Sequence, residues 1–341
     1  MTFTIRTEPA GHAFTVEPGQ TVLEAAIAQH IGLPYGCRNG KCGSCTAQLV
    51  KGRVTYPSGA VEALAGQPAD ACLTCQAVPG SDLVLRVSEV TTAAEIPVRT
   101  LPCRVVDKRM LNHDVIRLGL KLPEGQRLQF LAGQYLEFIL ADGRKRAFSI
   151  ANAPHDDALI ELHVRRVPGG EFTDYVFDVL EEKTILRVQG PLGSFVLRED
   201  SDRPMLLIGG GTGFAPLKGL LEHAFHTGID RPMTLYWGVR SRRDLYLPDL
   251  PEQWAAAHAH FRYVPVLSEP DADWQGRRGY VHEAVLEDHP QIAGYDVYLS
   301  GPPVMVEAGR SAFEARGLSM DHMFSDAFEW AADSPAFKSG S

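Results

Sequence analysis

The sequence contains no run of 18 or more apolar residues, so no segment is long enough to cross a bilayer as a helix. Its first residues, Met1–Arg6, lack the basic and apolar regions of a secretory signal peptide. Positive charge is also scarce, because 33 Lys and Arg stand against 42 Asp and Glu and leave a net charge of −9. That balance argues against a nucleic-acid or anionic-membrane partner. These features lead us to expect a cytoplasmic protein, and the length of 341 residues suggests two or three domains.

Cysteine is uncommon as well, yet three of the six cysteines fall within nine positions. Cys37, Cys42 and Cys45 have C-x4-C-x2-C spacing, the plant-type spacing for the ligands of a [2Fe–2S] cluster. Glycines within and beside this loop allow positive φ angles and let amide N–H groups donate to the sulfides of an anionic cluster. These glycines are Gly36, Gly40 and Gly43. The sequence therefore predicts an iron–sulfur site in this loop.

Three other interpretations of the cysteines are less favoured. A structural zinc site prefers two close pairs or mixed Cys/His ligands, and the twelve histidines are scattered. A disulfide framework suits a short secreted chain. Buried cysteines that only pack would not recur at fixed spacing between glycines. Spacing alone leaves the fourth ligand open, because Cys72 and Cys75 both follow the loop.

Residues 1–92 show a pattern of short strands with one helix. A capping-box pattern at Thr21–Glu24 predicts where the helix begins. The expected strands are Phe3–Thr7, His12–Val16, Thr46–Val50 and Leu83–Val87. With the metal loop, this region resembles a plant-type ferredoxin, which implies a β-grasp fold. Ferredoxins carry their last ligand in a Leu-Thr-Cys context, which favours Cys75 and leaves Cys72 and Cys103 as packing residues.

Residues 93–99 have no strong period and are expected to be a linker, after which residues 100–200 are expected to be all-β. Six short strands separated by turn residues suggest a small barrel, with one helix at Phe172–Leu180. The expected strands are Cys103–Lys108, Val115–Lys121, Gln134–Leu140, Arg144–Ile150, Ile160–Arg166 and Thr184–Gln189.

Residues 203–332 alternate strands with helical segments, which predicts an α/β domain with a parallel sheet covered on both faces. The expected strands are Met205–Ile208, Met233–Gly238, Phe261–Leu267, Asp296–Leu299 and Met320–Phe324. Ligands of such sheets bind beyond the C-terminal ends of the strands. Residues 333–341 are expected to be a tail.

Four motifs in residues 146–195 occur in the order found in the ferredoxin–NADP reductase superfamily, which the sequence resembles. They are Arg146-Ala147-Phe148-Ser149; Glu161–Arg166 with His163, Val164 and Arg165; Gly169, Gly170 and Thr173; and Gly190–Phe195. The first motif alone would be an ordinary strand end. The resemblance implies a six-stranded antiparallel flavin-binding barrel in which Arg146 binds the FAD pyrophosphate, Phe148 packs on the isoalloxazine and Ser149 lies near N5. It also implies that Gly170 and Thr173 meet phosphate near a helix N-terminus.

The glycine-rich turn Gly209–Gly213 follows a strand and opens a helix, so its backbone N–H groups can approach a pyrophosphate. It departs from G-x-G-x-x-G because Phe214 occupies the place of the last glycine, but it matches the superfamily pattern G-G-x-G-x-[AT]-P. The resemblance implies that residues of this turn bind the nicotinamide nucleotide. They are Gly210, Gly211, Thr212, Gly213 and Pro216.

Three later segments complete the resemblance. Ser300–Met305 is similar to the superfamily motif C-G-P-P-x-M, with Ser300 in place of the cysteine that faces the nicotinamide and with Gly301 and Pro302 as cofactor contacts. Gly238–Tyr246 has the pattern G-[VA]-R…D-L-Y, whose owners mostly use NADH. Three arginines in or beside it could instead grip a 2′-phosphate, namely Arg240, Arg242 and Arg243. Phe328 aligns with an aromatic that covers the flavin, although it could simply be a core residue.

The whole chain resembles the NADH-dependent reductase components of benzoate, phenol and methane oxygenases and the CDP-6-deoxy-glucoseen reductases. The resemblance implies a monomeric oxidoreductase in which Ser149, Ser300 and Phe328 serve hydride transfer. Electrons would pass from NADH through FAD and a [2Fe–2S] cluster to an oxygenase or a deoxysugar dehydrase, with the protein positioning the cofactors. The alternatives are a flavin or quinone reductase whose cluster is incidental, and a redox-sensing module without turnover. No helix-turn-helix motif or basic patch supports the latter.

Overall fold

The computed structural model describes residues 2–29, 31, 33–35, 40, 41, 43, 45–59, 61–87, 96–124, 126 and 128–328. The chain forms two compact units, of which the first comprises Met1–Pro97 with Gly193–Phe195, and the second Val98–Leu192 with Val196–Ser341. The predicted linker lies partly outside the described residues, and its last residue, Arg99, already begins a strand. The predicted tail lies outside them entirely, so the domain boundaries stay predictions.

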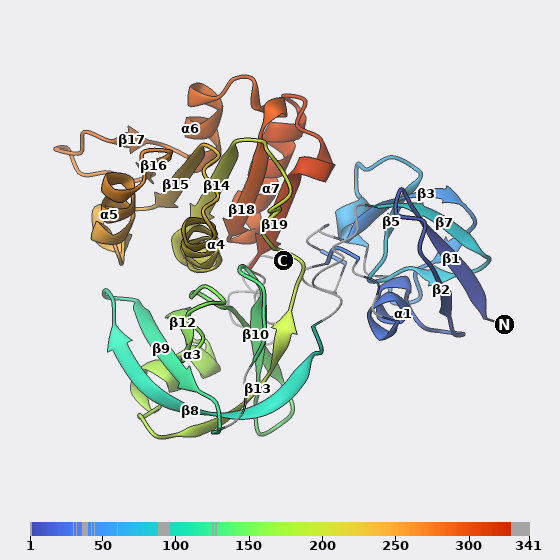
Figure 1. Cartoon of the computed structure of the whole chain (residues 1–341), viewed down its shortest axis with the longest axis horizontal. Helices are drawn as coiled ribbons and strands as arrows, with labels where there is room; N and C mark the ends of the chain where they lie inside the picture. Colours follow the sequence, from blue (N-terminus) through green and yellow to red (C-terminus); the bar gives the residue numbers. More distant parts are fainter. Residues whose placement is uncertain are drawn as a thin grey trace. The chain divides into compact units, whose positions relative to one another are not determined.

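The described residues of the first unit form a five-stranded sheet, a separate two-stranded sheet and one α-helix (Figure 1). Its elements are β1 (Phe3–Glu8), β2 (Ala13–Val16), α1 (Val22–Ala28), β3 (Thr46–Lys51), β4 (Val54–Thr55), β5 (Ala71–Leu73), β6 (Val78–Pro79) and β7 (Leu83–Arg86). The sheet order is β2-β1-β7-β3-β5, with β1 and β7 parallel. The predicted hairpin, helix and later strands are therefore confirmed, as is the β-grasp class.

Helix α1 begins where the capping box predicts. The Thr21 backbone N–H donates to Glu24 Oε2 at 2.9 Å, and the Glu24 N–H donates to Thr21 Oγ1 at 3.2 Å. Two donors that the first helical turn leaves without intrahelical partners are thereby satisfied. The helix buries Val22, Leu23 and two alanines in the core of the unit.

The second unit begins with an antiparallel barrel (Figure 1). Its elements are β8 (Arg99–Met110), β9 (Val115–Lys121), β10 (Tyr135–Ile139), β11 (Lys145–Ser149), β12 (Ile160–Arg165), α3 (Glu171–Asp178) and β13 (Ile185–Leu192). The strand order is β11-β10-β13-β8-β9-β12, and a bridge between Ile150 and Leu162 links the two outer strands. All six predicted strands and the predicted helix are confirmed; β9 has the predicted bounds, and the others have shifted ends.

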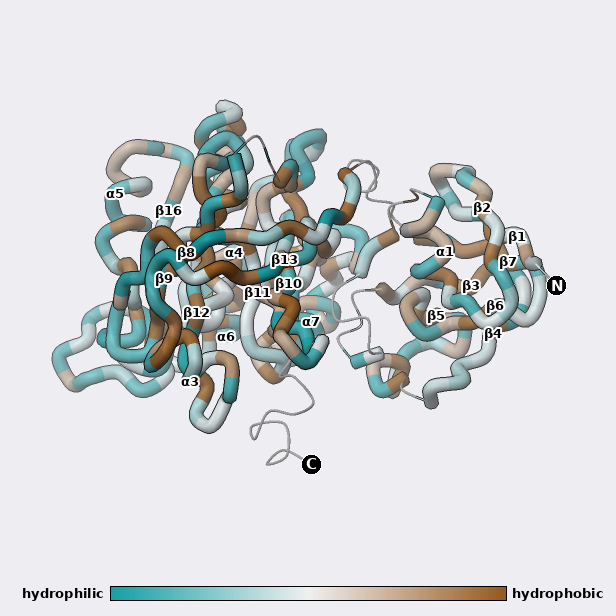
Figure 2. Tube along the Cα trace, turned by 90° about the horizontal axis from the view of Figure 1, so that it is seen from below, coloured by the Kyte–Doolittle hydropathy of each residue, from teal (hydrophilic) through white to brown (hydrophobic). Residues whose placement is uncertain are grey.

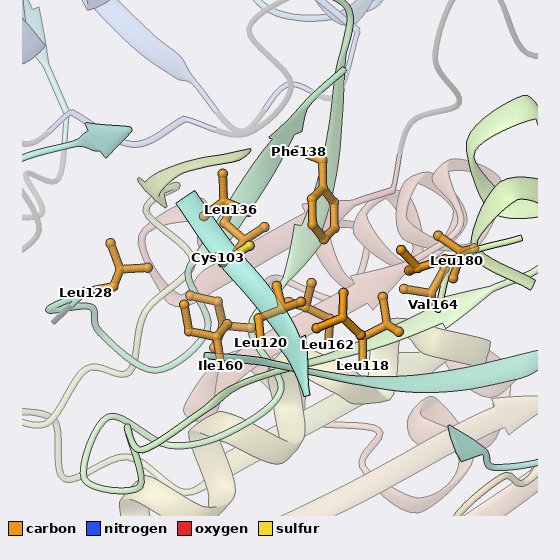
Figure 3. Close-up of a cluster of buried hydrophobic side chains, with 14 of the residues drawn as sticks. Cys103, Leu118, Leu120, Leu128, Leu136, Phe138, Ile160, Leu162, Val164 and Leu180 are labelled. Carbon is orange, nitrogen blue, oxygen red and sulfur yellow. The ribbon is translucent and has the colours of Figure 1, made fainter. Parts of the chain in front are cut away.

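Alternating side chains fill the barrel. Apolar residues are interspersed with polar ones along its strands, as the hydropathy colouring shows (Figure 2). The inward set includes Leu118, Leu120, Phe138 and Leu162, which meet in one buried cluster (Figure 3). Cys103 lies in the same cluster, which agrees with its predicted packing role.

The nucleotide lobe of the second unit is a six-stranded parallel sheet with helices on both faces. Its elements are β14 (Met205–Gly210), α4 (Phe214–Thr227), β15 (Met233–Val239), α5 (Asp249–Ala257), β16 (Phe261–Leu267), β17 (Arg277–Arg278), α6 (Val281–Asp288), β18 (Asp296–Gly301), α7 (Pro303–Glu314) and β19 (Met323–Ala327). Strand order is β17-β16-β15-β14-β18-β19. The order reverses between β14 and β18, the switch point where ligands of such sheets bind. The predicted α/β class is confirmed.

Among the described residues, no helix is both long enough and apolar enough to cross a membrane. Short 3-10 turns complete the fold, including one at Gly211–Gly213 between β14 and α4 and one at Arg242–Asp244 after β15. Both turns lie at the C-terminal ends of sheet strands, where the predicted nucleotide motifs fall.

Candidate functional site

Two of the predicted cluster ligands lie side by side. Cys45 Sγ and Cys75 Sγ are 3.2 Å apart, and both residues are buried. That separation exceeds a disulfide bond of about 2.05 Å, and it is short enough for one metal ion to contact both sulfurs. Cys37 and Cys42 lie outside the described residues. The pairing supports Cys75 as the fourth ligand.

The described part of the cluster loop has the backbone that its glycines predict. Gly40 and Gly43 have φ angles of +85° and +71°, values that other residues rarely adopt. Thr46 Oγ1 donates to the Gly43 carbonyl at 2.7 Å, which anchors the loop to β3. The donor set of thiolates and the curved backbone fit a [2Fe–2S] cluster.

The remaining two described thiols suit packing better than metal binding. Burial raises the pKa of Cys72 to about 11 and that of Cys103 to about 12. At neutral pH both groups are therefore protonated thiols, the form that packs as a small hydrophobic side chain. Cys72 is fully buried on β5, an element too short to be recognised in the sequence.

The predicted flavin strand is β11, which ends the barrel sheet. Phe148 packs against Phe138 and Phe172, each at a ring-centroid distance of 5.7 Å, and is only partly buried. Arg146, two residues earlier on the same face, is also partly exposed, while Ala147 is exposed on the other face. A partly exposed aromatic with an arginine beside it fits a flat ring that carries a pyrophosphate.

The turn before α3 is built on two glycines. Gly169 has a φ angle of +72°, and a side chain at Gly170 would lie 2.8 Å from Thr173 Oγ1. That hydroxyl accepts from the Val167 N–H at 3.1 Å and donates to the Gly170 carbonyl at 3.0 Å. Thr173 therefore shapes the turn through its side chain, and its contact with a phosphate stays a prediction.

Strand β12 carries polar residues that the nucleotide lobe buries. Val164 points into the barrel core, whereas Glu161 and His163 lie on the opposite face and are nevertheless buried. His163 Nδ1 lies 3.0 Å from the Tyr246 hydroxyl, and Nε2 lies 2.9 Å from Glu161 Oε1. Both ring nitrogens are therefore occupied within the protein, so only the backbone of His163 remains for a cofactor. Burial lowers the pKa of His163 more than the Glu161 carboxylate raises it.

The last polar residue of β12 reaches the glycine-rich turn. Arg165 Nε donates to Asp114 Oδ2 at 2.7 Å. Its Nη1 lies 3.1 Å from where a Cβ on Gly211 would stand, so the guanidinium lies against the turn. Arg165 thus places a positive charge at the turn that is expected to bind the nucleotide pyrophosphate.

The turn itself is packed tightly against the end of β18. A side chain on Gly213 would lie 2.0 Å from the Ser300 carbonyl oxygen, and one on Gly210 would lie 2.4 Å from Met305 Sδ. Gly301 has a φ angle of +145°, and Pro302 caps helix α7. These glycines are thus required by packing, in addition to any approach of phosphate to Gly211 and Thr212.

A cluster of aromatic side chains packs against the glycine-rich turn. Phe214 stacks on Trp237 at 4.0 Å, and the Trp237 indole N–H donates to the Gly211 carbonyl at 2.9 Å. Tyr246 packs edge-on against both rings. Phe214 therefore replaces the usual glycine without obstructing the turn, because its side chain is buried in this cluster. Pro216 lies in the first turn of α4, as predicted.

The ends of the flavin strand and of the nucleotide sheet meet through an aspartate that no sequence motif includes. Ser149 Oγ donates to Asp326 Oδ2 at 3.2 Å, and Asp326 is the strand partner of Ser300 across β18 and β19. The Phe328 N–H donates to the Gly301 carbonyl at 2.8 Å. The three residues expected to serve hydride transfer, Ser149, Ser300 and Phe328, thus gather around one strand junction.

Ser300 is fully buried, and no described residue forms a hydrogen bond with its Oγ. A buried hydroxyl without a partner costs about 1–3 kcal/mol. We expect Ser300→Cys, which restores the residue usual in the superfamily, to raise the free energy of unfolding by about 1 kcal/mol and to keep NADH-dependent ferricyanide reduction near the wild-type rate. Urea unfolding and steady-state kinetics measure both. Lower stability of the cysteine variant would show that the hydroxyl has a stabilising partner.

The Gly238–Tyr246 segment leaves two arginines, Arg240 and Arg243, exposed and without an ion pair to a described residue. Arg242 lies 3.3 Å from Asp273 and 5.4 Å from the Trp274 ring, which draws it toward a neighbouring loop. The Arg240 side chain is exposed and forms no ion pair with a described residue. Asp244 accepts from the Ser241 N–H and hydroxyl, both at 2.8 Å, and fixes the turn.

A ferredoxin-like unit with paired thiols, a barrel and a nucleotide lobe at a sheet switch point define an iron–sulfur flavoprotein oxidoreductase. Family models agree: residues 5–80 match the 2Fe-2S iron-sulfur cluster binding domain, 102–197 the oxidoreductase FAD-binding domain and 207–311 the oxidoreductase NAD-binding domain. The chain thus carries the domains for a [2Fe–2S] cluster, FAD and NAD.

Relatives match over nearly the whole chain. The CDP-6-deoxy-L-threo-D-glycero-4-hexulose-3-dehydrase reductase of Yersinia pestis is 38% identical over 96% of this chain and 99% of its own length. The reductase subunit of an aromatic O-demethylase from Amycolatopsis is 39% identical over 94% and 96%. A crystal structure of an Amycolatopsis cytochrome P450 reductase superposes with a TM-score of 0.74 at 37% identity, covering 96% of this chain and 98% of that one. The chain belongs to the electron-transfer reductases of the ferredoxin–NAD(P) reductase superfamily that combine [2Fe–2S], FAD and NAD domains.

Proposed function

We propose that this chain accepts electrons from NADH and delivers them one at a time to a separate protein, either an oxygenase component or a CDP-hexulose dehydrase. One observation carries the proposal: the end of the flavin strand contacts the nicotinamide end of the sheet through Ser149 and Asp326. A nicotinamide held at Ser300–Pro302 would therefore lie beside a flavin held at Arg146–Ser149. FAD supplies the conversion between the electron pair of a hydride and the single electrons that an iron–sulfur cluster carries.

The residues of this chain bind and orient both cofactors. Arg146 and the exposed part of Phe148 are assigned to FAD, and the Gly211–Gly213 turn with Arg165 to the nucleotide pyrophosphate. Cys45 and Cys75, with Cys37 and Cys42, are assigned to the cluster. Asp326 and Phe328, both partly buried, lie at the junction itself. Such positioning is the contribution a protein makes to cofactor chemistry.

The acceptor is tested by reconstitution. The purified reductase is mixed with NADH and either a CDP-hexulose dehydrase with its sugar substrate or an aromatic oxygenase component with its substrate. Product formed in only one mixture identifies the acceptor class. Product in neither, together with fast reduction of free flavin or quinone, would favour the flavin-reductase alternative.

We expect NADH to be preferred over NADPH by about tenfold in kcat/KM. This is about the effect of one charge-assisted hydrogen bond, which a dedicated 2′-phosphate site would give to NADPH and which we expect this site to lack. Arg242 is engaged by Asp273 and Trp274, so a 2′-phosphate would find the exposed side chains of Arg240 and Arg243. Steady-state kinetics with both donors measure the ratio. A preference for NADPH would mean that these arginines bind the 2′-phosphate.

We also propose that the reductase works as a cytoplasmic monomer. Cys72 and Cys103 are buried and form no disulfide bond, which agrees with a reducing compartment.

A further inference from the structure

A chain of polar side chains crosses from the flavin barrel to the nucleotide lobe, and its members are almost completely buried. Tyr246 of the nucleotide lobe lies 3.0 Å from His163 of β12, and His163 lies 2.9 Å from Glu161 on the same strand. Glu161 is then 3.4 Å from Lys218 Nζ, which returns to the nucleotide lobe on α4. We call Tyr246, His163, Glu161 and Lys218 the bridging network.

The direction of each hydrogen bond in the bridging network is fixed by chemistry. The pKa of Glu161 lies below its usual range because the His163 hydrogen bond and the Lys218 charge outweigh the effect of burial, so this group is a carboxylate that only accepts. His163 Nε2 must therefore carry the proton that it shares with Glu161. Because burial keeps the imidazole neutral, Nδ1 has no proton and accepts from the Tyr246 hydroxyl.

Further contacts secure Glu161 and Lys218. Arg117 Nη2 donates to Glu161 Oε2 at 2.7 Å. Lys218 Nζ donates to the Ala151 carbonyl at 3.2 Å and to Glu222 at 2.9 Å. The next residue of α4, Gly219, lets the helix approach closely, since a Cβ there would lie 3.1 Å from the Asn152 carbonyl oxygen. The barrel and α4 are thus held at a defined separation.

The bridging network ends on the segments that carry the cofactor motifs. Tyr246 closes the Gly238–Tyr246 segment, and Lys218 lies one turn after the glycine-rich turn on α4. His163 directly precedes Val164 and Arg165 of the flavin motif. A second barrel contact joins the same segment, where Asn112 Nδ2 donates to the Arg243 carbonyl at 3.1 Å. Any shift of the network would therefore move the nucleotide segments relative to the flavin strand.

Buried polar groups are a costly way to join two lobes. Apolar side chains of similar size often stabilise as well or better, whereas a directional polar link can select one arrangement among several. We propose that His163 is a positioning residue for hydride transfer: through Tyr246 and Glu161 it fixes the nucleotide-binding segments against the flavin-binding strand. This inference rests on the proposed function.

Tyr246→Phe removes the hydroxyl and keeps the ring in its aromatic cluster. We expect the rate constant of flavin reduction at saturating NADH to fall about tenfold, since misplacement by about an ångström costs up to a hundredfold in rate. The dissociation constant of NAD⁺ should rise several-fold, and the charge-transfer absorbance between nicotinamide and flavin should weaken. Anaerobic stopped-flow spectroscopy and equilibrium titration with NAD⁺ measure these three quantities.

Tyr236→Phe is the matched control. Tyr236 is another fully buried tyrosine whose hydroxyl donates to a side chain, Asp288 Oδ2, at 2.8 Å, but this bond lies wholly within the nucleotide lobe. Both variants should lose similar stability in urea. Only Tyr246→Phe should change flavin reduction, NAD⁺ affinity and charge-transfer absorbance.

His163→Gln completes the test. The amide nitrogen of the glutamine can occupy about the position of His163 Nε2. The variant therefore keeps a donor for Glu161 and loses the Nδ1 acceptor for Tyr246. If one link carries the effect, His163→Gln and Tyr246→Phe each slow flavin reduction, and the double variant is no slower than either.

Three outcomes overturn the inference. Wild-type flavin reduction in folded Tyr246→Phe, or equal slowing in Tyr236→Phe, would reduce the bridging network to a stabilising contact. Additive effects of His163→Gln and Tyr246→Phe would show that the two residues act independently on flavin reduction. A different result would overturn the proposed function: a wild-type protein that neither binds NAD⁺ nor is reduced by NADH. The inference would then fail as well.

Discussion

Cys75→Ser is expected to abolish the [2Fe–2S] cluster while leaving the flavin and nucleotide sites intact. Cys75 Sγ lies 3.2 Å from Cys45 Sγ, and a hard hydroxyl oxygen replaces a thiolate poorly in iron–sulfur ligation. The second compact unit contains both the barrel and the nucleotide lobe, so it should stay folded. NADH should therefore still reduce FAD and, through it, ferricyanide. Cytochrome c reduction, which draws on the cluster, should fall to background.

Cys72→Ser is the matched control for Cys75→Ser. Cys72 is fully buried three residues away, and its raised pKa of about 11 suits a packing thiol. This variant should keep its iron, its visible spectrum and both activities, with a modest loss of stability. Loss of the cluster in the Cys72 variant and its survival in the Cys75 variant would reverse the ligand assignment. Unchanged cytochrome c reduction by both variants would remove the cluster from the electron path.

Gly213→Ala is expected to destabilise the nucleotide lobe more than alanine at any other described glycine of the lobe. The new Cβ would lie 2.0 Å from the Ser300 carbonyl oxygen and 2.5 Å from its carbonyl carbon, which are backbone atoms that cannot rotate away. Overpacking of this kind costs about 3 kcal/mol, and relief requires the turn to move away from β18. Since that movement would displace Ser300 and the nucleotide site together, flavin reduction by NADH should be lost while FAD stays bound.

Gly294→Ala is the control for Gly213→Ala. Gly294 lies in a 3-10 turn of the same lobe, has no positive φ, and a Cβ there meets nothing within 4 Å. Its free energy of unfolding should change by less than about 0.5 kcal/mol. Urea unfolding and anaerobic stopped-flow spectroscopy compare the two variants. Wild-type flavin reduction by Gly213→Ala would show that the turn can relax without disturbing Ser300.

Much of the fold was predictable because hydrophobic periodicity is local. Strands β9 and β16 match their predicted bounds, and the capping box places the start of α1. Strands β5 and β17 were missed because three and two residues are too short to show a period. Their pairing depends on neighbours that are distant in sequence.

The site was predictable where a motif specifies chemistry and less so where burial depends on another lobe. The cluster loop is recognisable from its cysteine spacing, and the glycine-rich turn from its pattern of glycines between a strand and a helix. Alternation along β12 suggests that Glu161 and His163 face solvent, yet the nucleotide lobe covers them. Asp326 could not be found from the sequence, since its proximity to Ser149 follows from the pairing of β18 with β19.

Electron flow from NADH through the flavin to the cluster is the central claim, and one comparison tests it most directly. NADH is mixed anaerobically with the complete protein and with protein stripped of FAD, and the electron paramagnetic resonance signal of the reduced cluster is followed by rapid freezing. We expect the signal to grow in the complete protein as the flavin bleaches, and to be absent from the FAD-free protein, whose cluster dithionite still reduces. A cluster that stays oxidised in the complete protein, or that NADH reduces equally fast without FAD, would contradict the account.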